Sequence, residues 1–276
     1  MGIYLNSRRV AFFALLLVIV SLLYSSTFQA PFNFDDELVI KSQVVDAHAQ
    51  AMLISRANWF EDIFHEPRYR HLFYSSLIFN YSLGKLNPLG YHLVNTLLHF
   101  LTSIVIFFIA SITIEKGLSL GRKEAFTIAS LTALLFSVNP VNSEAVNYIS
   151  ARASGMSSFF YLFALLSFIL GSLRKQKTTL RLLLYFLSLA CFLAAILSKE
   201  TALTFPLTLI LYDFCFMRNS QFIPTKKRFL FFYIPILLCS VISVFKVFSM
   251  KSMIIDWWQR IDFEYGLKQI QIIGYG

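Results

Sequence analysis

Residues 89–114 read LGYHLVNTLLHFLTSIVIFFIASITI, a stretch with no Asp, Glu, Lys or Arg that is long enough for a helix to cross ~30 Å of hydrocarbon. Within it His92, Asn95 and His99 recur at helical spacing. Polar groups on a membrane helix usually hydrogen-bond to neighbouring helices, and no further ligand lies at metal-binding spacing. The stretch therefore predicts a transmembrane helix with a polar stripe facing other helices, and no metal site.

The composition extends this prediction to the whole chain. Of 276 residues, 57% are hydrophobic and 14% are charged, against about 25% charged in soluble domains. This indicates an all-α polytopic membrane protein. The net charge of +9 is better explained by cytoplasmic loops than by nucleic-acid binding. Cys191, Cys215 and Cys239 lie in apolar runs at wide spacing, so they indicate buried thiols rather than disulfides or a metal site.

Seven apolar runs predict seven transmembrane helices. The first follows Arg8 and Arg9 like a signal peptide, but it lacks a small-residue cleavage site, so we expect an uncleaved span with a cytoplasmic N-terminus. A further apolar segment, 71–83, is too short to span easily and is expected in the interface or as a re-entrant piece. The predicted spans are 10–28, 89–114, 125–138, 154–173, 180–197, 202–217 and 229–248.

The distribution of charge orients these spans. The predicted cytoplasmic stretches hold thirteen of the 24 cations but only three of the 15 acids, a net charge of +10. The opposite side holds the rest, a net charge of −1. Cations concentrated in short inner loops agree with the positive-inside rule. Three polar clusters therefore fall on the non-cytoplasmic side: residues 34–37, 139–144 and 198–200.

The longest connection is the first outer loop, residues 29–70. Its segment 49–65 alternates apolar side chains with charged ones in the pattern of an amphipathic helix. Such a helix would lie flat on the membrane surface with Trp59 as an interfacial anchor. The loop is thus expected to carry interfacial helical structure.

The acidic cluster at the start of this loop has two interpretations. Asp35, Asp36 and Glu37 can be a solvated turn that stops the first span from sliding into lipid. Alternatively, one of the two aspartates is a general base or part of a metal-binding pair, since adjacent carboxylates raise one another's pKa. In extended backbone Asp35 and Asp36 point to opposite sides, so only one of them would face a substrate.

The other two clusters also allow structural and functional interpretations. Glu144 and Arg152 can form an ion pair beside a capped helix, or Arg152 can hold a phosphate through its fork of donors. Lys199 and Glu200 can compensate each other at a helical hairpin, or Lys199 can bind an anionic lipid head group.

A series of short motifs resembles the membrane part of the transmembrane, tetratricopeptide-repeat O-mannosyltransferase-like proteins, which have the C-type glycosyltransferase fold. The match runs from about Phe34 to Gln271. The motifs, in chain order, are Phe34-Asp35-Asp36, Tyr69-Arg70, Asn80-Tyr81, Leu86-Asn87-Pro88, Gly90-Tyr91-His92-Leu93-Val94-Asn95 with Leu98-His99, Asn139-Pro140-Val141, Ser143-Glu144-Ala145-Val146 with Arg152, Leu197-Ser198-Lys199-Glu200 and Leu211-Tyr212-Asp213.

The resemblance implies an enzyme that moves a sugar, mannose in the family, from a polyprenyl-phosphate carrier to an acceptor hydroxyl of a protein. Asp35 or Asp36 would be the catalytic base, and Arg152 and Lys199 would bind the donor phosphate. The remaining polar residues expected to support them are Glu37, Arg70, His92, Glu144 and Glu200. The active side would be periplasmic or lumenal, with a bacterial inner membrane favoured. The resemblance assigns no cofactor and leaves divalent-metal dependence open.

Two motifs depart from the family. Asn139-Pro140 stands where relatives usually have His-Pro, and Arg70-His71-Leu72 where they have Arg-Pro-Leu. The resemblance implies that residues 1–276 are one glycosyltransferase-like domain whose C-terminal part is absent, since relatives continue into further spans and repeats. The expectation is either a fragment or a separate partner chain that supplies the rest.

Two other classes of function compete with an enzyme. A non-catalytic membrane subunit could bind a polyprenyl-phosphate lipid or a partner chain without transferring sugar. A transporter would place ionisable groups near mid-membrane on broken helices, whereas this chain gathers its charges at one surface. The sequence thus favours a lipid-linked-sugar glycosyltransferase, with the non-catalytic subunit as the alternative.

Overall fold

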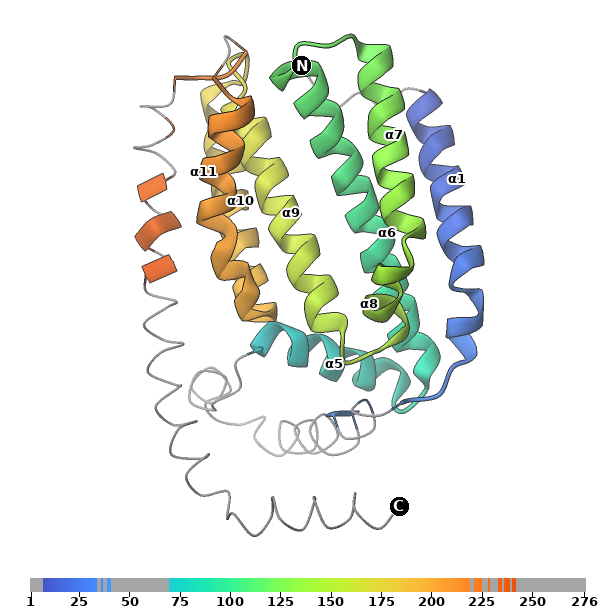
Figure 1. The fold of residues 1–276 in the computed structure, drawn as a ribbon. Helices are drawn as coiled ribbons and strands as arrows, with labels where there is room; N and C mark the ends of the chain where they lie inside the picture. Colours follow the sequence, from blue (N-terminus) through green and yellow to red (C-terminus); the bar gives the residue numbers. More distant parts are fainter. Residues whose placement is uncertain are drawn as a thin grey trace, which may run out of the picture.

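The computed structural model describes residues 7–33, 36, 39–40, 70–218, 221–224, 228, 233, 234, 236–238, 240 and 241. These residues form a bundle of helices without any β-strand beyond one isolated bridge, which confirms the all-α prediction for this part (Figure 1). Three helices are long and apolar enough to cross a membrane, or four if the bent pair after Gly121 is one span. The chain is an integral membrane protein.

Helices stand at six of the seven predicted spans, while residues 229–248 lie mostly outside the described part, so the seven-span count stays a prediction. The predicted interfacial helix at 49–65 also lies outside it. The elements are α1 (Ser7–Leu23), η1 (Ser25–Gln29), α5 (His71–Gly84), α6 (Pro88–Ile112), η3 (Thr113–Gly117), α7 (Arg122–Val138), η4 (Pro140–Asn142), α8 (Ser143–Asn147), α9 (Arg152–Ser172), α10 (Thr178–Ser198), η5 (Glu200–Thr204) and α11 (Phe205–Phe216).

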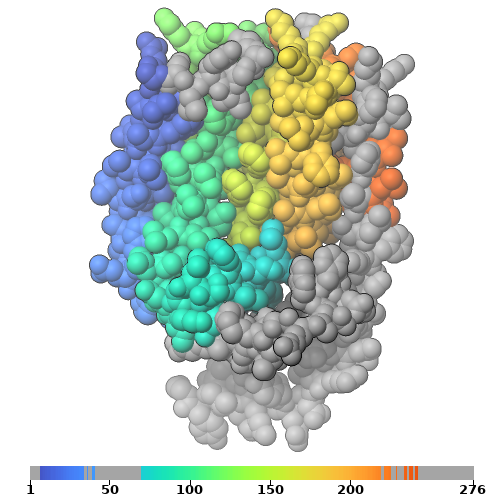
Figure 2. All heavy atoms as spheres, turned by 180° about the vertical axis from the view of Figure 1, so that it is seen from behind, coloured from blue at the N-terminus to red at the C-terminus, as the bar shows by residue number. Residues whose placement is uncertain are grey.

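The long helices alternate in direction, and this places η1, α5, η4, α8 and η5 together at one end of the bundle (Figure 1). We call this the α5 end. Helix α5 lies across it rather than along the bundle, and Figure 2 shows its cyan surface beneath the neighbouring helices. The segment predicted to be too short to span is therefore a helix packed across the α5 end.

Helix α6 lies in the middle of the bundle because its polar stripe faces inward and its leucines face outward. His92, Asn95 and His99 are buried, whereas Leu93 and Leu97 are about half exposed. This is the arrangement expected in lipid, where polar groups must find partners inside the bundle. Asn87 caps the helix by accepting a hydrogen bond from the backbone N–H of residue 89 at 3.1 Å, and Pro88 occupies its first turn.

Helices α9 and α10 pack as an antiparallel pair that depends on small residues. A Cβ atom at Gly171 would come within 2.9 Å of the Tyr185 ring, so only glycine permits this approach. The Ser188 hydroxyl donates to the carbonyl oxygen of Ala164 at 2.7 Å, which joins the two helices by a buried hydrogen bond. Close backbone approach and an interhelical hydrogen bond are typical of helix pairs in membranes.

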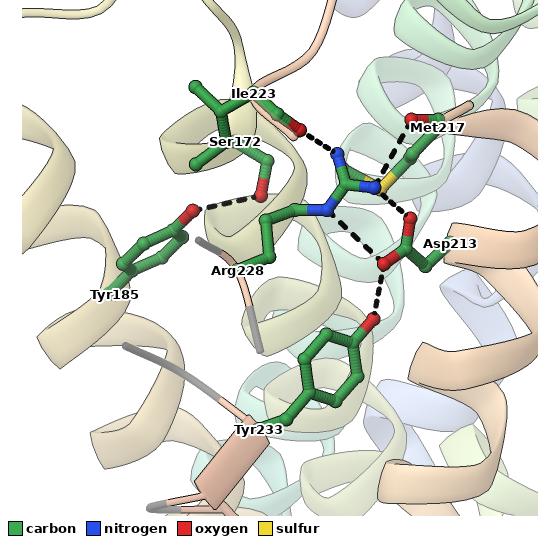
Figure 3. Close-up of polar contacts among 7 residues, drawn as sticks. All are labelled: Ser172, Tyr185, Asp213, Met217, Ile223, Arg228 and Tyr233. Atoms are coloured by element: carbon green, nitrogen blue, oxygen red, sulfur yellow. Dashed lines mark hydrogen bonds and ion pairs between the residues drawn. The ribbon is translucent and has the colours of Figure 1, made fainter. Parts of the chain in front are cut away.

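A buried ion pair joins α11 to the chain that follows it (Figure 3). Its aspartate lies in the last turn of α11, at the end of that helix that is far from α5 in Figure 1. The Arg228 guanidinium donates from Nε and Nη2 to the carboxylate of Asp213, and also to the carbonyl oxygens of Ile223 and Met217. The hydroxyl of Tyr233 donates to Asp213 Oδ2 at 2.7 Å. Asp213 and Arg228 are both buried, and the donors and acceptors around them offset the cost of removing their charges from water.

Candidate functional site

The α5 end brings together the described members of the three polar clusters, although they are far apart in sequence. Asp36, Glu144, Arg152 and Lys199 all lie there, on or beside the turns that join the long helices. Asp35 and Glu37 lie outside the described residues. The clusters therefore belong to one region of the molecule, and each side chain has a different environment within it.

The Asp36 carboxylate is engaged entirely within the protein. Its Oδ1 atom accepts hydrogen bonds from the backbone N–H of Ser150 at 2.7 Å and from the Ser150 hydroxyl at 2.6 Å. Its Oδ2 atom accepts from the backbone N–H of Ile149 at 3.3 Å. Only 1% of the residue is exposed. Asp36 thus fastens the first outer loop to the turn between α8 and α9.

Arg152 lies in the first turn of α9 and is completely buried. All three guanidinium nitrogens donate to protein oxygens: Nε to Asn95 Oδ1 at 2.7 Å, Nη1 to Asn80 Oδ1 at 2.6 Å, and Nη2 to the Tyr91 carbonyl at 2.9 Å. Nη1 also lies 3.4 Å from both oxygens of Ser76. No carboxylate among the described residues lies within ion-pair distance of it. Arg152 therefore joins α5, α6 and α9.

Asn95 links this arginine to the α8–α9 turn. While its Oδ1 accepts from Arg152, its Nδ2 donates to the carbonyl oxygens of Val146 and Tyr148, each at 3.3 Å. The neighbouring His92 is also buried and contacts the carbonyl oxygen of Ala30 through Nε2 at 3.2 Å. The polar stripe of α6 thereby holds both the α8–α9 turn and the start of the first outer loop.

Lys199 makes fewer hydrogen bonds than Arg152 among the described residues. Its half-buried ammonium group donates to the Ser154 hydroxyl at 2.7 Å, and no carboxylate in the described part lies within ion-pair distance. The adjacent Glu200 accepts from Arg70 at 3.3 Å, which ties the start of α5 to η5. Burial acts to raise the pKa of Glu200, but its own backbone N–H, Arg70 and Lys199 outweigh this and lower it below its ordinary value. Glu200 is therefore ionised at neutral pH and forms an ion pair with Arg70.

A pocket of about 360 Å³ opens among these residues, and Lys199 and Glu144 both line it. Asp36 and Arg152 do not line it, but Asn95, which accepts from Arg152, forms part of its wall. The other residues that line the pocket are His99, Thr102, Phe136, Val141, Asn142, Ala145, Ala151, Ser154, Gly155 and Ser158. A cavity with one ammonium group, one carboxylate and several hydroxyl and amide groups is suited to a polar anionic ligand.

The expected division of roles changes with this geometry. Among the described residues the ammonium group of Lys199 bonds only to Ser154, so it can offer an anion two further N–H donors and a positive charge that no described carboxylate pairs with. All three guanidinium nitrogens of Arg152 donate hydrogen bonds to protein oxygens, so Arg152 does not contact a ligand in the pocket directly. Its positive charge can still act on the pocket, through Asn95 and at a distance. In the part of the chain that the structure describes, no three His, Cys, Asp or Glu side chains gather as a metal site would require.

The motifs did not identify the partners of these residues. Ser150 and Ser154 bind Asp36 and Lys199, yet as single serines near a helix start they resemble ordinary capping residues. Asn80 could be noticed in the sequence because it belongs to one of the motifs quoted above. Its hydrogen bond with Arg152 could not, because the two residues are 72 positions apart. Such pairings depend on packing between helices, which the local pattern does not contain.

The chain is similar in sequence to several curated protein O-mannosyl-transferases. It is 32% identical to Tmtc1 of Drosophila melanogaster over 187 residues, which is 66% of this chain and 20% of that protein. It is 32% identical to Tmtc3 of the same organism over 158 residues and to human TMTC1 over 163 residues. These matches cover 52% and 55% of this chain, and 17% of each relative. The resemblance predicted from the motifs is confirmed at this level.

The chain thus spans about a fifth of the length of these relatives. No family model matches it, and no solved structure matches it either.

Proposed function

We propose, from its similarity to protein O-mannosyl-transferases, that this chain forms the donor-binding membrane part of a glycosyltransferase. The donor would be a sugar, mannose in the first instance, linked to a polyprenyl phosphate. The acceptor would be a hydroxyl group of a protein. The observation that carries the proposal is that Lys199 and Glu144 line one pocket at the α5 end.

The pocket suits such a donor because it combines a cation with hydroxyl and amide groups next to apolar helices. The phosphate would bind at Lys199, where the ammonium group has unused donors and no carboxylate partner within the described residues. The polyprenyl chain would lie against the apolar helix surfaces, and sugar hydroxyls would bond to polar groups such as Asn142. Lys199 thus takes the phosphate-binding role, and Arg152 supports the pocket through its hydrogen bond to Asn95.

The reaction is a single displacement. The acceptor oxygen forms a bond to the anomeric carbon of the sugar, while the bond from that carbon to the phosphate oxygen breaks. The polyprenyl phosphate leaves with the electron pair, and the acceptor proton passes to a carboxylate. The positive charge of Lys199 stabilises the negative charge that develops on the leaving phosphate.

We place the reaction on the non-cytoplasmic side of the membrane. The support is the charge distribution, since the predicted cytoplasmic stretches have a net charge of +10 and the other side −1. A periplasmic or lumenal compartment follows from this orientation.

Lys199→Ala is expected to weaken binding of polyprenyl phosphate by roughly 10- to 100-fold, because a charge-assisted hydrogen bond contributes about 1.5–3 kcal/mol. Transfer of sugar should fall as well, because the same contact exists in the transition state. Binding and transfer are measured in native membranes, where any partner chain is present. Lys177→Ala is the matched control, since Lys177 is exposed at the start of α10, at the other end of the bundle.

The second candidate function is a subunit that binds the lipid carrier without catalysis. It is favoured by the engagement of Asp36, one of the two expected bases, with backbone groups inside the protein. Lys199-dependent binding without any sugar transfer in membranes would support this alternative. Unchanged binding in Lys199→Ala would contradict the phosphate assignment under both functions.

A further inference from the structure

The C-terminal end of α7 accepts hydrogen bonds from two side chains that line the pocket. The last carbonyl groups of a helix have no partner inside it, and α7 ends at Val138. His99 Nε2 lies 3.0 Å from the carbonyl oxygen of Ser137. Asn142 donates from Nδ2 to the carbonyl oxygen of Phe136 at 2.8 Å. Since a carbonyl oxygen only accepts, both side chains use an N–H group to bind α7.

These two bonds leave one hydrogen-bond acceptor free on each side chain. The His99 ring is neutral, because it is buried without a described carboxylate at ion-pair distance and an unpaired buried charge is costly. A neutral imidazole that donates from Nε2 carries a lone pair on Nδ1, and an amide that donates from nitrogen keeps its oxygen as an acceptor. Within the described residues no hydrogen bond engages His99 Nδ1 or Asn142 Oδ1.

The two buried histidines of α6 differ at Nδ1. In His92 this atom is buried without a partner, and His92 does not line the pocket. His99 does line the pocket, and its Nδ1 is not among the buried, unpartnered side-chain atoms of the described residues. The free acceptor of His99 is therefore accessible from the cavity.

Aromatic neighbours hold the His99 ring in one orientation. Phe136, which also lines the pocket, stacks on it with the ring centroids 5.2 Å apart. Tyr24 meets the ring edge-on, with the centroids 5.5 Å apart. Because Nε2 is also bound to α7, Nδ1 has a fixed position beside an aromatic side chain. A sugar ring suits this surface, since it carries hydroxyl donors at its edge and apolar C–H groups on its faces.

The polar groups of the pocket thus differ in what they can bind. Lys199 offers only N–H donors, which suit a phosphate. His99 Nδ1 and Asn142 Oδ1 offer only lone pairs, which repel an anion and accept from hydroxyl groups. A sugar linked to a phosphate requires both kinds of group in one pocket.

We propose that His99 and Asn142 recognise the donor sugar, each by accepting a hydrogen bond from one of its hydroxyl groups, with Phe136 against a C–H face. This inference rests on the proposed glycosyltransferase function and specifies the class of sugar. The sugar is neutral and has free hydroxyl groups. A uronic acid would place its carboxylate against two lone pairs and near the carboxylate of Glu144, which lines the same pocket.

The test measures, in native membranes, the binding of polyprenyl phosphate with and without a linked mannose. His99→Phe keeps an aromatic ring but removes the acceptor. It should weaken binding of the sugar-bearing lipid by about 3- to 10-fold, the usual contribution of one neutral hydrogen bond, and leave binding of the bare lipid unchanged. Asn142→Ala, at a half-buried position, should have the same selective effect.

Donors that each lack one sugar hydroxyl identify the group that His99 binds. Removal of that hydroxyl should weaken binding to the wild type by the same factor and leave binding to His99→Phe unchanged, because the acceptor is already missing there. Asn142→Ala carries the same comparison if His99→Phe does not fold. His92→Phe is the matched control: it loses a contact with the Ala30 carbonyl oxygen, so it should lower stability without changing the preference for the sugar-bearing lipid.

Two results would overturn this inference and leave the phosphate at Lys199. One is equal binding of the two lipids by the wild type. The other is a full loss of affinity for every deoxygenated donor in His99→Phe and Asn142→Ala, as large as in the wild type. Failure of wild-type membranes to bind either lipid would instead overturn the proposed function, and this inference with it.

Discussion

Replacement of Arg152 by alanine is expected to lower the free energy of unfolding by about 3 kcal/mol or more, because buried oxygens on two neighbouring helices lose their hydrogen-bond donor. The guanidinium group is completely buried and joins Asn95, Asn80 and Tyr91 from two other helices. Its loss leaves these buried oxygens without a donor, and each unsatisfied group costs about 1–3 kcal/mol.

Thermal unfolding of the purified protein in detergent measures this effect. Arg152→Lys should recover little of the stability, because one ammonium group cannot reproduce the planar fork that reaches three oxygens. Arg122→Ala is the control, since the Arg122 side chain is 70% exposed and its ion pair with Glu115 contributes at most about 1 kcal/mol. A melting temperature for Arg152→Ala equal to that of the control would show that the arginine does not hold α5 and α6 to α9.

Replacement of Asp213 by alanine is expected to lower the free energy of unfolding by about 3–5 kcal/mol, because it removes the buried carboxylate that pairs with the buried Arg228 guanidinium. The Tyr233 hydroxyl would lose its acceptor at the same time (Figure 3). The double variant Asp213→Leu with Arg228→Met should be more stable than Asp213→Ala, since apolar side chains at both positions leave no charge to be buried there.

The same detergent melts test this prediction, with Arg218→Ala as the matched control. Arg218 is exposed and lies over the Phe214 ring at 4.0 Å, so its removal should cost about 0.5–1 kcal/mol. Equal stability of Asp213→Ala and the double variant would contradict the prediction, because it would mean that burying the Arg228 charge without Asp213 costs no stability.

The parts of the fold that could be predicted from sequence depend on local hydrophobicity. The run 89–114 indicated α6 because an apolar stretch of that length has few alternatives in a membrane protein. The segment 71–83 could be separated from the spans by its length alone, and it forms α5 across the end of the bundle. The polar stripe of α6 was visible as helical spacing, and its members are buried as that spacing indicated.

The environments of the polar residues could not be predicted in the same way. Asp36 and Lys199 are both charged residues beside an apolar run. The Asp36 carboxylate accepts hydrogen bonds from two backbone N–H groups, whereas Lys199 lines the pocket. The partners of Asp36 lie 113 and 114 positions away, so the difference arises from how α8 and α9 meet the first outer loop. The sequence suggested Arg152 as a phosphate ligand because its motif does not show which groups surround the guanidinium. In the structure, oxygens of α5 and α6 accept its hydrogen bonds.

The central claim, that this pocket holds the lipid-linked donor, is tested most directly by filling the pocket. Gly155 lines it, and a Cβ atom there would meet only the Ala145 carbonyl oxygen, at 3.9 Å, so a larger side chain grows into the pocket. The matched control is Gly84→Leu at the end of α5, where an added Cβ meets nothing within 4 Å.

Binding of polyprenyl phosphate to Gly155→Leu is the measurement. We predict that affinity falls by roughly tenfold or more, a loss of about 1.4 kcal/mol or more, while the melting temperature stays close to that of Gly84→Leu. A folded Gly155→Leu protein that binds polyprenyl phosphate as tightly as the wild type would contradict the claim and place the donor elsewhere.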